Sequence, residues 1–287
     1  TLANNLSYNK DFDTHIPQFY GGKAYGLARI VSVAYSSCVP GYAIPYSYMH
    51  ASLGGKLDEI KKLIGLVKDW NDEEDAEKTC GIIKAIIKSC NFISLSLPIP
   101  NSYWAVRSSA IGEDGEKYSF AGLHDSFLMV RADEVNRRVV DCWASLYNPR
   151  AMMYRVKMGL DPLEAKMGVV VQQMAMARSA HTIFSIDPTG LAGNAMIVES
   201  VWGYCEPLVS GELTPGLTVI KSISAGYVDT KTIVRPQSWM LAVKSRRTRI
   251  GVDKPIRYDV RKVLERVETS DGLTTTPDLP YDKLSFM

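Results

Sequence analysis

The residue types best suited to chemistry gather in one stretch, residues 104–130, WAVRSSAIGEDGEKYSFAGLHDSFLMV. An apolar, β-prone run ends at Arg107, and a polar segment that begins with Ser108 and Ser109 leads through Gly122 to a second β-prone run. This layout predicts a hairpin with a polar tip. A guanidinium supplies forked, charge-assisted donors, and a glycine lets backbone N–H groups approach a ligand. The pattern fits a phosphate-binding site and fits a solvated hairpin with a surface Arg–Glu pair equally well.

A second cation stands at the predicted start of a helix. Gly21, Gly22 and Lys23 precede AYGLARIVSVA, in which apolar residues recur at helical spacing. Lys23 would therefore lie at a helix N-terminus, where unpaired N–H groups and the helix dipole favour an anion. A phosphate contact fits this position, but a solvated lysine in a turn explains these residues on their own; the later motifs are what favour the contact.

A third stretch suits a nucleotide base. Residues 167–174, MGVVVQQM, form an apolar run that turns polar at Gln172, which predicts a buried strand with a polar end. An amide or an exposed backbone can pair with the donor and acceptor edge of adenine, and Met174 offers a soft apolar surface.

The bulk composition is that of an ordinary globular chain. Its 287 residues can form two subdomains with their own cores; 46% are hydrophobic and 22% charged. The net charge of +2, from 33 basic and 31 acidic side chains, gives no reason to expect nucleic acid or an anionic membrane as a partner. No apolar run approaches the roughly 20 residues of a membrane span, and TLANNLSYNK is not a signal peptide.

The cysteines indicate a reducing compartment. There are five, an odd number, and they are scattered without a CxxC pair, so we expect reduced thiols and a cytoplasmic protein. The chain begins with Thr1 and ends on PYDKLSFM, so we also expect a processed chain or a fragment.

Between these stretches the elements are mixed. Apolar residues at helical spacing predict two amphipathic helices across residues 57–90, which we interpret as scaffold packing on the N-terminal lobe. Asp133 is a natural cap for a further helix that ends at Asn148 and Pro149, and strands follow from residue 167 onward. The strands alternate irregularly with helices, without a βαβ repeat, which favours an α+β fold.

Several motifs together resemble one family. VRSSAIGED and SFAGLHDSFLMV resemble the signature of the ATP-binding domain of the phosphoenolpyruvate synthase and pyruvate phosphate dikinase family, which includes rifampin phosphotransferase and the ATP-binding subunit of phenylphosphate synthase. Five further blocks occur in the family's order: GGKAYGLARI, CWASLYNPRAMMYR, VVVQQM, FSIDP and WGYCEPLVSGELTP. Ordered blocks over roughly residues 20–220 are a far more specific signal than a lone Gly-rich match.

The resemblance implies an ATP-grasp fold, in which two α+β lobes hold the nucleotide in a cleft between antiparallel sheets. We expect residues 1–100 to form an N-terminal lobe with the helical insert, and residues 101–287 to form the ATP-grasp core. The hinge should lie near residues 172–176, and the C-terminal part of the core should be incomplete.

The expected site combines the residue chemistry with the resemblance. Lys23 and Arg107 are the candidate catalytic residues, because fixed cations neutralise phosphate charge as it shifts during transfer. The candidate ATP contacts are Lys23, Arg107, Ser108, Gly122, Ser126, Gln172 and Met174. The resemblance also implies Mg²⁺, with metal ligands expected beyond the end of this chain.

The function implied by the resemblance is that of a dikinase-type phosphotransferase. ATP phosphorylates a histidine on a swivelling domain or partner chain, AMP and phosphate are released, and a small acceptor, pyruvate-like or phenol-like, receives the phosphoryl group. The four histidines here are isolated and match no swivelling-domain motif, so the phosphohistidine should lie outside this chain. Two alternatives remain: a rifampin-type antibiotic phosphotransferase, and a degenerate non-catalytic scaffold, against which the retention of Lys23 and Arg107 argues.

Overall fold

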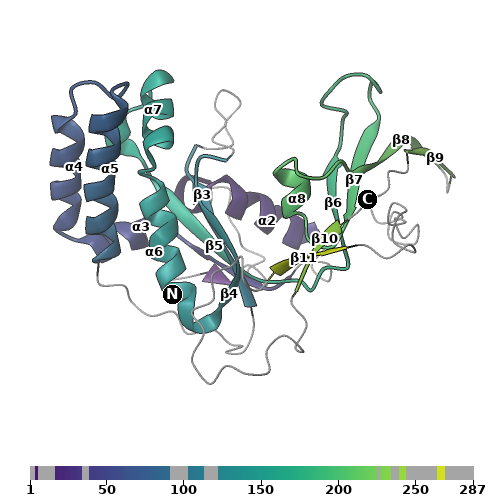
Figure 1. Ribbon diagram of the computed structural model, residues 1–287, viewed down its shortest axis with the longest axis horizontal. Coiled ribbons are helices and arrows are strands. Elements are labelled where there is room, and N and C mark those ends of the chain that lie inside the picture. Colours follow the sequence, from purple (N-terminus) through teal and green to yellow (C-terminus); the bar gives the residue numbers. More distant parts are fainter. Residues whose placement is uncertain are drawn as a thin grey trace. The chain divides into compact units, whose positions relative to one another are not determined.

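The chain forms two compact units, residues 1–175 and 176–287, each described here by itself. The computed structural model (Figure 1) describes residues 4–5, 17–33, 39–90, 103–112, 122–224, 227–233, 239–243 and 264–268. The units divide after Ala175. They do not divide at residue 100, because strands from both sides of that position hydrogen-bond into one sheet.

The first unit is built on a five-stranded sheet with the order β1-β2-β5-β3-β4. Its strands are β1 (Asn4–Asn5), β2 (Gly41–Ile44), β3 (Tyr103–Ala110), β4 (Ser126–Arg131) and β5 (Met167–Gln173). Every neighbouring pair is antiparallel. Mixed helices and antiparallel sheets confirm the predicted α+β class.

Strand β3 separates two chemistries by the alternation of its side chains. Trp104, Val106 and Ala110 face the main hydrophobic core. Arg107 and Ser109 therefore face the opposite side, where Val170 of β5 packs with Ala24 and Ala43. The same strand thus anchors the core with one face and presents polar groups on the other.

A β-bulge in β4 shifts its pairing with β3 by one residue. Trp104 pairs with Val130 and Val106 pairs with Phe127, so two residues of β4 oppose one residue of β3. The extra residue is accommodated at Met129, which is buried and has a φ of 54°. Beyond the bulge, Ser126 lies directly opposite Arg107.

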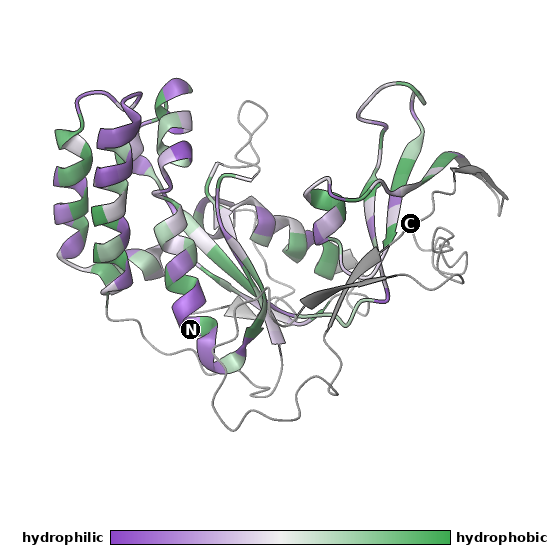
Figure 2. Ribbon diagram, in the orientation of Figure 1, coloured by the Kyte–Doolittle hydropathy of each residue, from purple (hydrophilic) through white to green (hydrophobic). Residues whose placement is uncertain are grey.

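Helices cover both faces of this sheet. The helices described in this unit are α1 (Pro17–Tyr20), α2 (Gly22–Val33), α3 (Tyr46–Leu53), α4 (Lys56–Leu66), α5 (Glu73–Lys88), α6 (Val135–Ser145) and α7 (Pro149–Lys157). The sheet is covered by α1, α2, α3 and α6, whereas α5 packs on α6 and α4 packs on α5. Figure 2 shows hydrophilic and hydrophobic residues mixed on α4 and α5, as their sequence periodicity predicts. Asp72 caps α5 by accepting hydrogen bonds from the N–H groups of Glu74 and Asp75.

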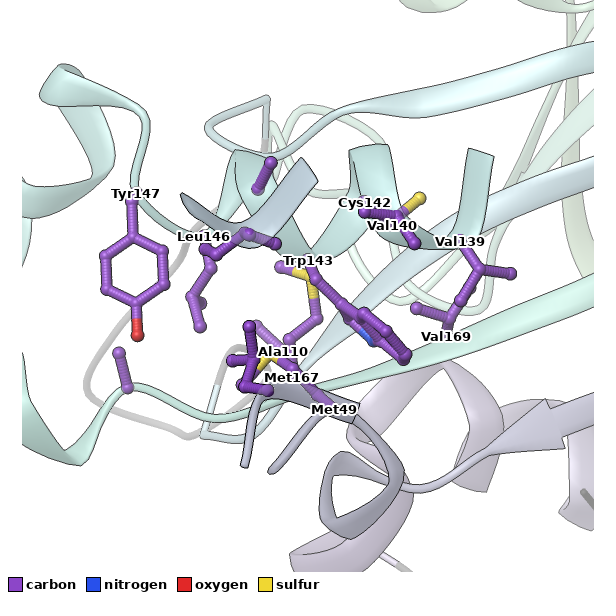
Figure 3. Packing of buried hydrophobic residues seen from close by; sticks show 14 of the residues in the cluster. Met49, Ala110, Val139, Val140, Cys142, Trp143, Leu146, Tyr147, Met167 and Val169 are labelled. Atoms are coloured by element: carbon purple, nitrogen blue, oxygen red, sulfur yellow. The ribbon is translucent and has the colours of Figure 1, made fainter. Parts of the chain in front are cut away.

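The main core lies between the sheet and α6. Trp143 is fully buried there, and Figure 3 shows it with Val139, Met167 and Val169 among the packed side chains. Because a close-packed core resists deformation, the strands and α6 provide a rigid base for the polar residues of β3.

The second unit contains a four-stranded antiparallel sheet with the order β6-β7-β8-β9. Its elements are β6 (Ser179–Phe184), β7 (Met196–Trp202), α8 (Glu206–Val209), β8 (Gly216–Ser224), β9 (Tyr227–Ile233) and the paired strands β10 (Trp239–Val243) and β11 (Leu264–Glu268). In the β6–β7 connection, the Asp187 carboxylate accepts hydrogen bonds from the Thr189 and Ala192 N–H groups. No helix in the described part of the chain is both long and apolar enough to cross a membrane.

The corner between α1 and α2 lies against the sheet so closely that a side chain is excluded. A Cβ on Gly168 of β5 would lie 2.3 Å from the carbonyl oxygen of Tyr20. Gly168→Ala should therefore lower the free energy of unfolding by about 1–3 kcal/mol, because backbone must move to admit the methyl group. Urea denaturation measures the change.

Gly81→Ala is the matched control. Gly81 lies exposed within α5 with no atom near its would-be Cβ, so alanine should leave stability unchanged or raise it by about 1 kcal/mol. Equal unfolding midpoints for Gly168→Ala and the wild type would contradict the close approach.

Candidate functional site

The N-terminus of α2 is fixed to strand β3. Gly21 is the residue before the helix, since its carbonyl accepts from the Tyr25 N–H at 3.2 Å, and a glycine has no side chain with which to cap the helix. The hydroxyl of Ser109, 85 residues away from Ala24, accepts a hydrogen bond from the Ala24 N–H at 3.3 Å instead. The helix cap is therefore supplied by another element, and Lys23 is held next to it.

Only glycine fits at this corner. Gly21 has a φ of +82°, and a Cβ there would lie 2.1 Å from the carbonyl oxygen of Ser109. Ser109 lies two positions from Arg107 on the same face of β3. The two predicted catalytic cations thus belong to backbone segments in direct contact.

The Cys142 thiol of α6 contacts the residues that immediately precede Arg107 and Ser126. These contacts are with the carbonyl oxygens of Val106, at 3.8 Å, and Asp125, at 3.7 Å. Burial raises the pKa of this thiol well above its ordinary value, and the positive charge of Lys23 opposes that rise.

Arg107 lies within β3, at the point where its pairing with β4 ends, and not at the end of the strand, which runs on to Ala110 because it still pairs with β5. It is partly exposed and stands opposite Ser126 of β4, which is exposed. Gly122, also exposed, has a φ of +74°, a conformation that glycine adopts without strain. An anion on this face could meet the guanidinium and a hydroxyl.

The predicted adenine residues lie at the other end of β5. Gln172 is opposite Ala105 and Gly41, on the Arg107 face, and its amide nitrogen donates to the carbonyl oxygen of Val39 at 3.0 Å. Met174 donates its backbone N–H to the carbonyl oxygen of Tyr103 at 2.8 Å. Both side chains are partly exposed.

The two adjacent serines have different surroundings. Ser108, a predicted ATP contact, is 1% exposed and lies on the core face of β3, so its side chain does not reach the face that carries Arg107. Ser109 lies on that face and caps α2. Strand alternation alone places position 109, two residues after the arginine, on the arginine's side.

A short loop leads into β4 and is held by the junction between α6 and α7. The Asn148 amide nitrogen donates to the Leu123 carbonyl oxygen at 3.3 Å and to the Asp125 carboxylate at 3.1 Å. The His124 ring nitrogen Nδ1 lies 3.3 Å from the Ser145 carbonyl oxygen. Residues 145–148 were predicted only as a helix end, and their sequence carries no local signal of this contact.

Two other histidines contact neighbouring side chains within the fold. His181 of β6 lies between Ser200, at 2.8 Å, and Ser179, at 3.3 Å, and the ring of His50 packs edge-on against Tyr46. His15 falls outside the described residues.

Within the ranges described above, no group of three or more His, Cys, Asp or Glu side chains is close enough to hold a metal ion. The Mg²⁺ site stays a prediction from the resemblance, with its ligands expected beyond these residues.

The fold defines an α+β domain in which the backbone segments that carry Lys23 and Arg107 are in contact, and two such cations would suit a polyphosphate. Residues 18–255 match the model of the family described as pyruvate phosphate dikinase, AMP/ATP-binding domain. The chain belongs to this family, which confirms the family inferred from its motifs.

Similar curated proteins include phosphotransferases. The chain is 36% identical over 223 residues to the phosphoenolpyruvate synthase of Aeropyrum pernix, covering 70% of this chain and 26% of that one. It is 30% identical over 214 residues to a probable phosphoenolpyruvate synthase of Methanocaldococcus jannaschii, covering 74% and 17%. It is 37% identical over 171 residues to a rifampicin phosphotransferase of a Streptomyces species, covering 59% and 19%. The chain thus spans well under a third of the length of these relatives.

The surroundings of His124 predict a pH dependence of stability. Burial, together with the positive charges of Arg155 and Lys23, lowers the pKa of His124 to about 4, against the opposing effects of the Ser145 carbonyl and Asp125. Between about pH 6.5 and 4 the unfolded chain binds a proton that the folded chain does not, so stability is lost as the pH falls. In His124→Asn this part of the slope, at most about 1.4 kcal/mol per pH unit, should disappear.

Urea denaturation at several pH values between 4 and 7 tests this. Asparagine keeps a donor near the Ser145 carbonyl, so the comparison isolates the titration of the ring. Stability curves for His124→Asn and the wild type that run parallel across this range would show that His124 titrates normally in the folded state.

Proposed function

We propose that this chain is the ATP-binding module of a dikinase-type phosphotransferase with an ATP-grasp fold. The observation that carries the proposal is the contact between the α2 N-terminus and β3, which holds Lys23 beside the strand that bears Arg107. Membership of a family named for its AMP/ATP-binding domain supports the choice of nucleotide.

In this proposal the phosphate chain of ATP lies at the corner between α2 and the β3–β4 hairpin. Lys23 and Arg107 neutralise its charge, and Gly122 and Ser126 supply backbone and hydroxyl contacts. Gln172 and Met174 serve the adenine side, at the other end of β5. Fixed cations are most effective when charge redistributes during phosphoryl transfer, because they need no reorganisation at that moment.

The reaction passes the β-phosphoryl group of ATP to a histidine on a swivelling domain or a partner chain. Water takes up the γ-phosphoryl group, so that AMP and inorganic phosphate are released. A small acceptor, pyruvate-like or phenol-like, then receives the group from the phosphohistidine. Similarity to proteins named phosphoenolpyruvate synthase supports this direction, and the span of the chain, under a third of those relatives, supports a separate histidine-bearing part. The scattered cysteines support a cytoplasmic setting.

A rifampicin-type phosphotransferase is the second candidate. The 37% identity to the Streptomyces enzyme is close to the 36% identity to the Aeropyrum pernix phosphoenolpyruvate synthase, so the ATP-binding part does not favour either acceptor. The two candidates share the ATP site and differ in the acceptor.

Arg107→Ala and Lys23→Ala should each weaken ATP binding about 10- to 100-fold, because each removes a charge-assisted contact to phosphate worth roughly 1.5–3 kcal/mol. Calorimetric titration of the chain with ATP measures the dissociation constant. Arg29→Ala is the control, since Arg29 is exposed on the same helix as Lys23 but in its C-terminal half. It should bind ATP like the wild type.

A wild-type chain that binds no ATP would refute the proposal and would favour the scaffold alternative. Equal affinities of Arg107→Ala and the wild type would place the phosphates elsewhere. Circular dichroism of each variant checks that the fold is retained.

The phosphoryl transfer itself has a direct test. ATP labelled at the β-phosphate, incubated with the chain and its complete histidine-bearing partner, should leave label on that partner as acid-labile, base-stable phosphohistidine, with AMP formed in equal amount. Label that remains in nucleotide, or AMP formed without labelled partner, would contradict the dikinase reaction while leaving ATP binding untouched.

A further inference from the structure

The side chain of Asn148 connects three separate parts of the first unit. It lies at the start of α7, and its amide nitrogen donates to the Leu123 carbonyl oxygen at 3.3 Å and to the Asp125 carboxylate at 3.1 Å. Its amide oxygen accepts from the Lys84 ammonium of α5 at 2.7 Å. All the polar atoms of the amide are thus used, although Asn148 does not cap its own helix with its side chain.

The charges on either side determine which way the amide points. An asparagine amide has an acceptor end and a donor end, and its orientation follows from the hydrogen-bond network. Lys84 can only donate, whereas the Leu123 carbonyl and the Asp125 carboxylate can only accept. The reversed orientation would set donor against donor and acceptor against acceptor, so Lys84 directs the NH₂ group toward the loop.

The same junction holds the loop through neighbouring residues. His124 contacts the Ser145 carbonyl oxygen, and the Asp125 carbonyl oxygen contacts the Cys142 thiol. Residues 123, 124 and 125 are therefore each attached to the segment from the end of α6 to the start of α7. On either side of them lie Gly122 and Ser126, and Ser126 stands opposite Arg107.

We propose that Asn148 is a positioning residue for the segment 122–126, which is the phosphate-binding loop of this proposal, with Lys84 of α5 fixing the direction of its amide. This inference rests on the proposed ATP site. Asn148 does not contact ATP itself in this proposal; it sets the position of the backbone at Gly122 and of the Ser126 hydroxyl relative to Arg107. The helix α5, interpreted from sequence as scaffold, thereby acts on the site through one ammonium group.

Asn148→Asp tests the donor end at constant size. Its second oxygen would face the Leu123 carbonyl and the Asp125 carboxylate, displace the loop and weaken ATP binding about ten-fold. The loss of these two hydrogen bonds should also lower the melting temperature, so circular dichroism of the variant checks that the fold is retained.

A reciprocal exchange separates positioning from charge. In Asn148→Asp with Asp125→Asn, the new amide at position 125 donates to the carboxylate at position 148, which restores one contact with reversed polarity. Asp125→Asn should therefore strengthen ATP binding several-fold more in the Asn148→Asp background than in the wild type. An equal effect in both backgrounds would mean that only the net charge near the phosphates matters, and would overturn the proposal.

The lysine has a matched control one helical turn away. Lys84→Met should weaken ATP binding a few-fold by releasing the amide, whereas Lys88→Met should not, since Lys88 pairs with Asp141 at 3.3 Å and has no contact with Asn148 among those described. Equal affinities of Lys84→Met and Lys88→Met would remove the lysine from the proposal.

Failure of this inference is distinguishable from failure of the proposed function. If the wild type binds ATP and Arg107→Ala does not, while Asn148→Asp binds like the wild type, the ATP site stands and the role of Asn148 is refuted. If neither the wild type nor any variant binds ATP, the proposed function falls first.

Discussion

The site depends on a backbone contact that only glycine permits. At the α1–α2 corner, Gly21 approaches Ser109, and Gly168 approaches Tyr20, at distances that a Cβ could not occupy. The Ser109 hydroxyl then caps the helix that Gly21, without a side chain, cannot cap. The α2 helix and β3 are joined through backbone and one short side chain, so the backbone at Lys23 has little freedom to move relative to β3. Longer linking side chains would lose rotamer freedom and hold the pair less firmly.

The two faces of β3 explain how the polar residues on one of them are held in position. One face contributes Trp104 and Val106 to the main core, in which Trp143 is fully buried. The other carries Arg107 and Ser109 beside a much smaller apolar cluster around Ala24 and Val170. The strand is fixed by burial on the first side, so the polar groups on the second need not contribute stability of their own.

The polar network around the loop has a different physical basis. It depends on complementary donors and acceptors rather than on apolar area, and each member restricts the next. Lys84 donates to the amide oxygen of Asn148, and the amide nitrogen of Asn148 donates to Leu123 and Asp125. The Ser145 carbonyl oxygen contacts the ring of His124. Such a network specifies the orientation of its side chains, which an apolar contact does not. It holds the segment next to Gly122, where a glycine would otherwise allow the backbone many conformations.

The sequence by itself determined the family, the α+β class, the helical insert and the elements that carry Lys23 and Arg107, because these follow from ordered motifs and from the local periodicity of apolar residues. Only the tertiary structure decided that residues on both sides of position 100 share one sheet, that Ser109 rather than Ser108 faces the Arg107 side and caps α2, and that Lys84 and Asn148 hold the loop. Each of these depends on contacts between residues far apart in the chain: Ala24 and Ser109 are separated by 85 positions, and Lys84 and Asn148 by 64. Local patterns describe which face of an element is apolar, but they do not specify which distant element will pack against it.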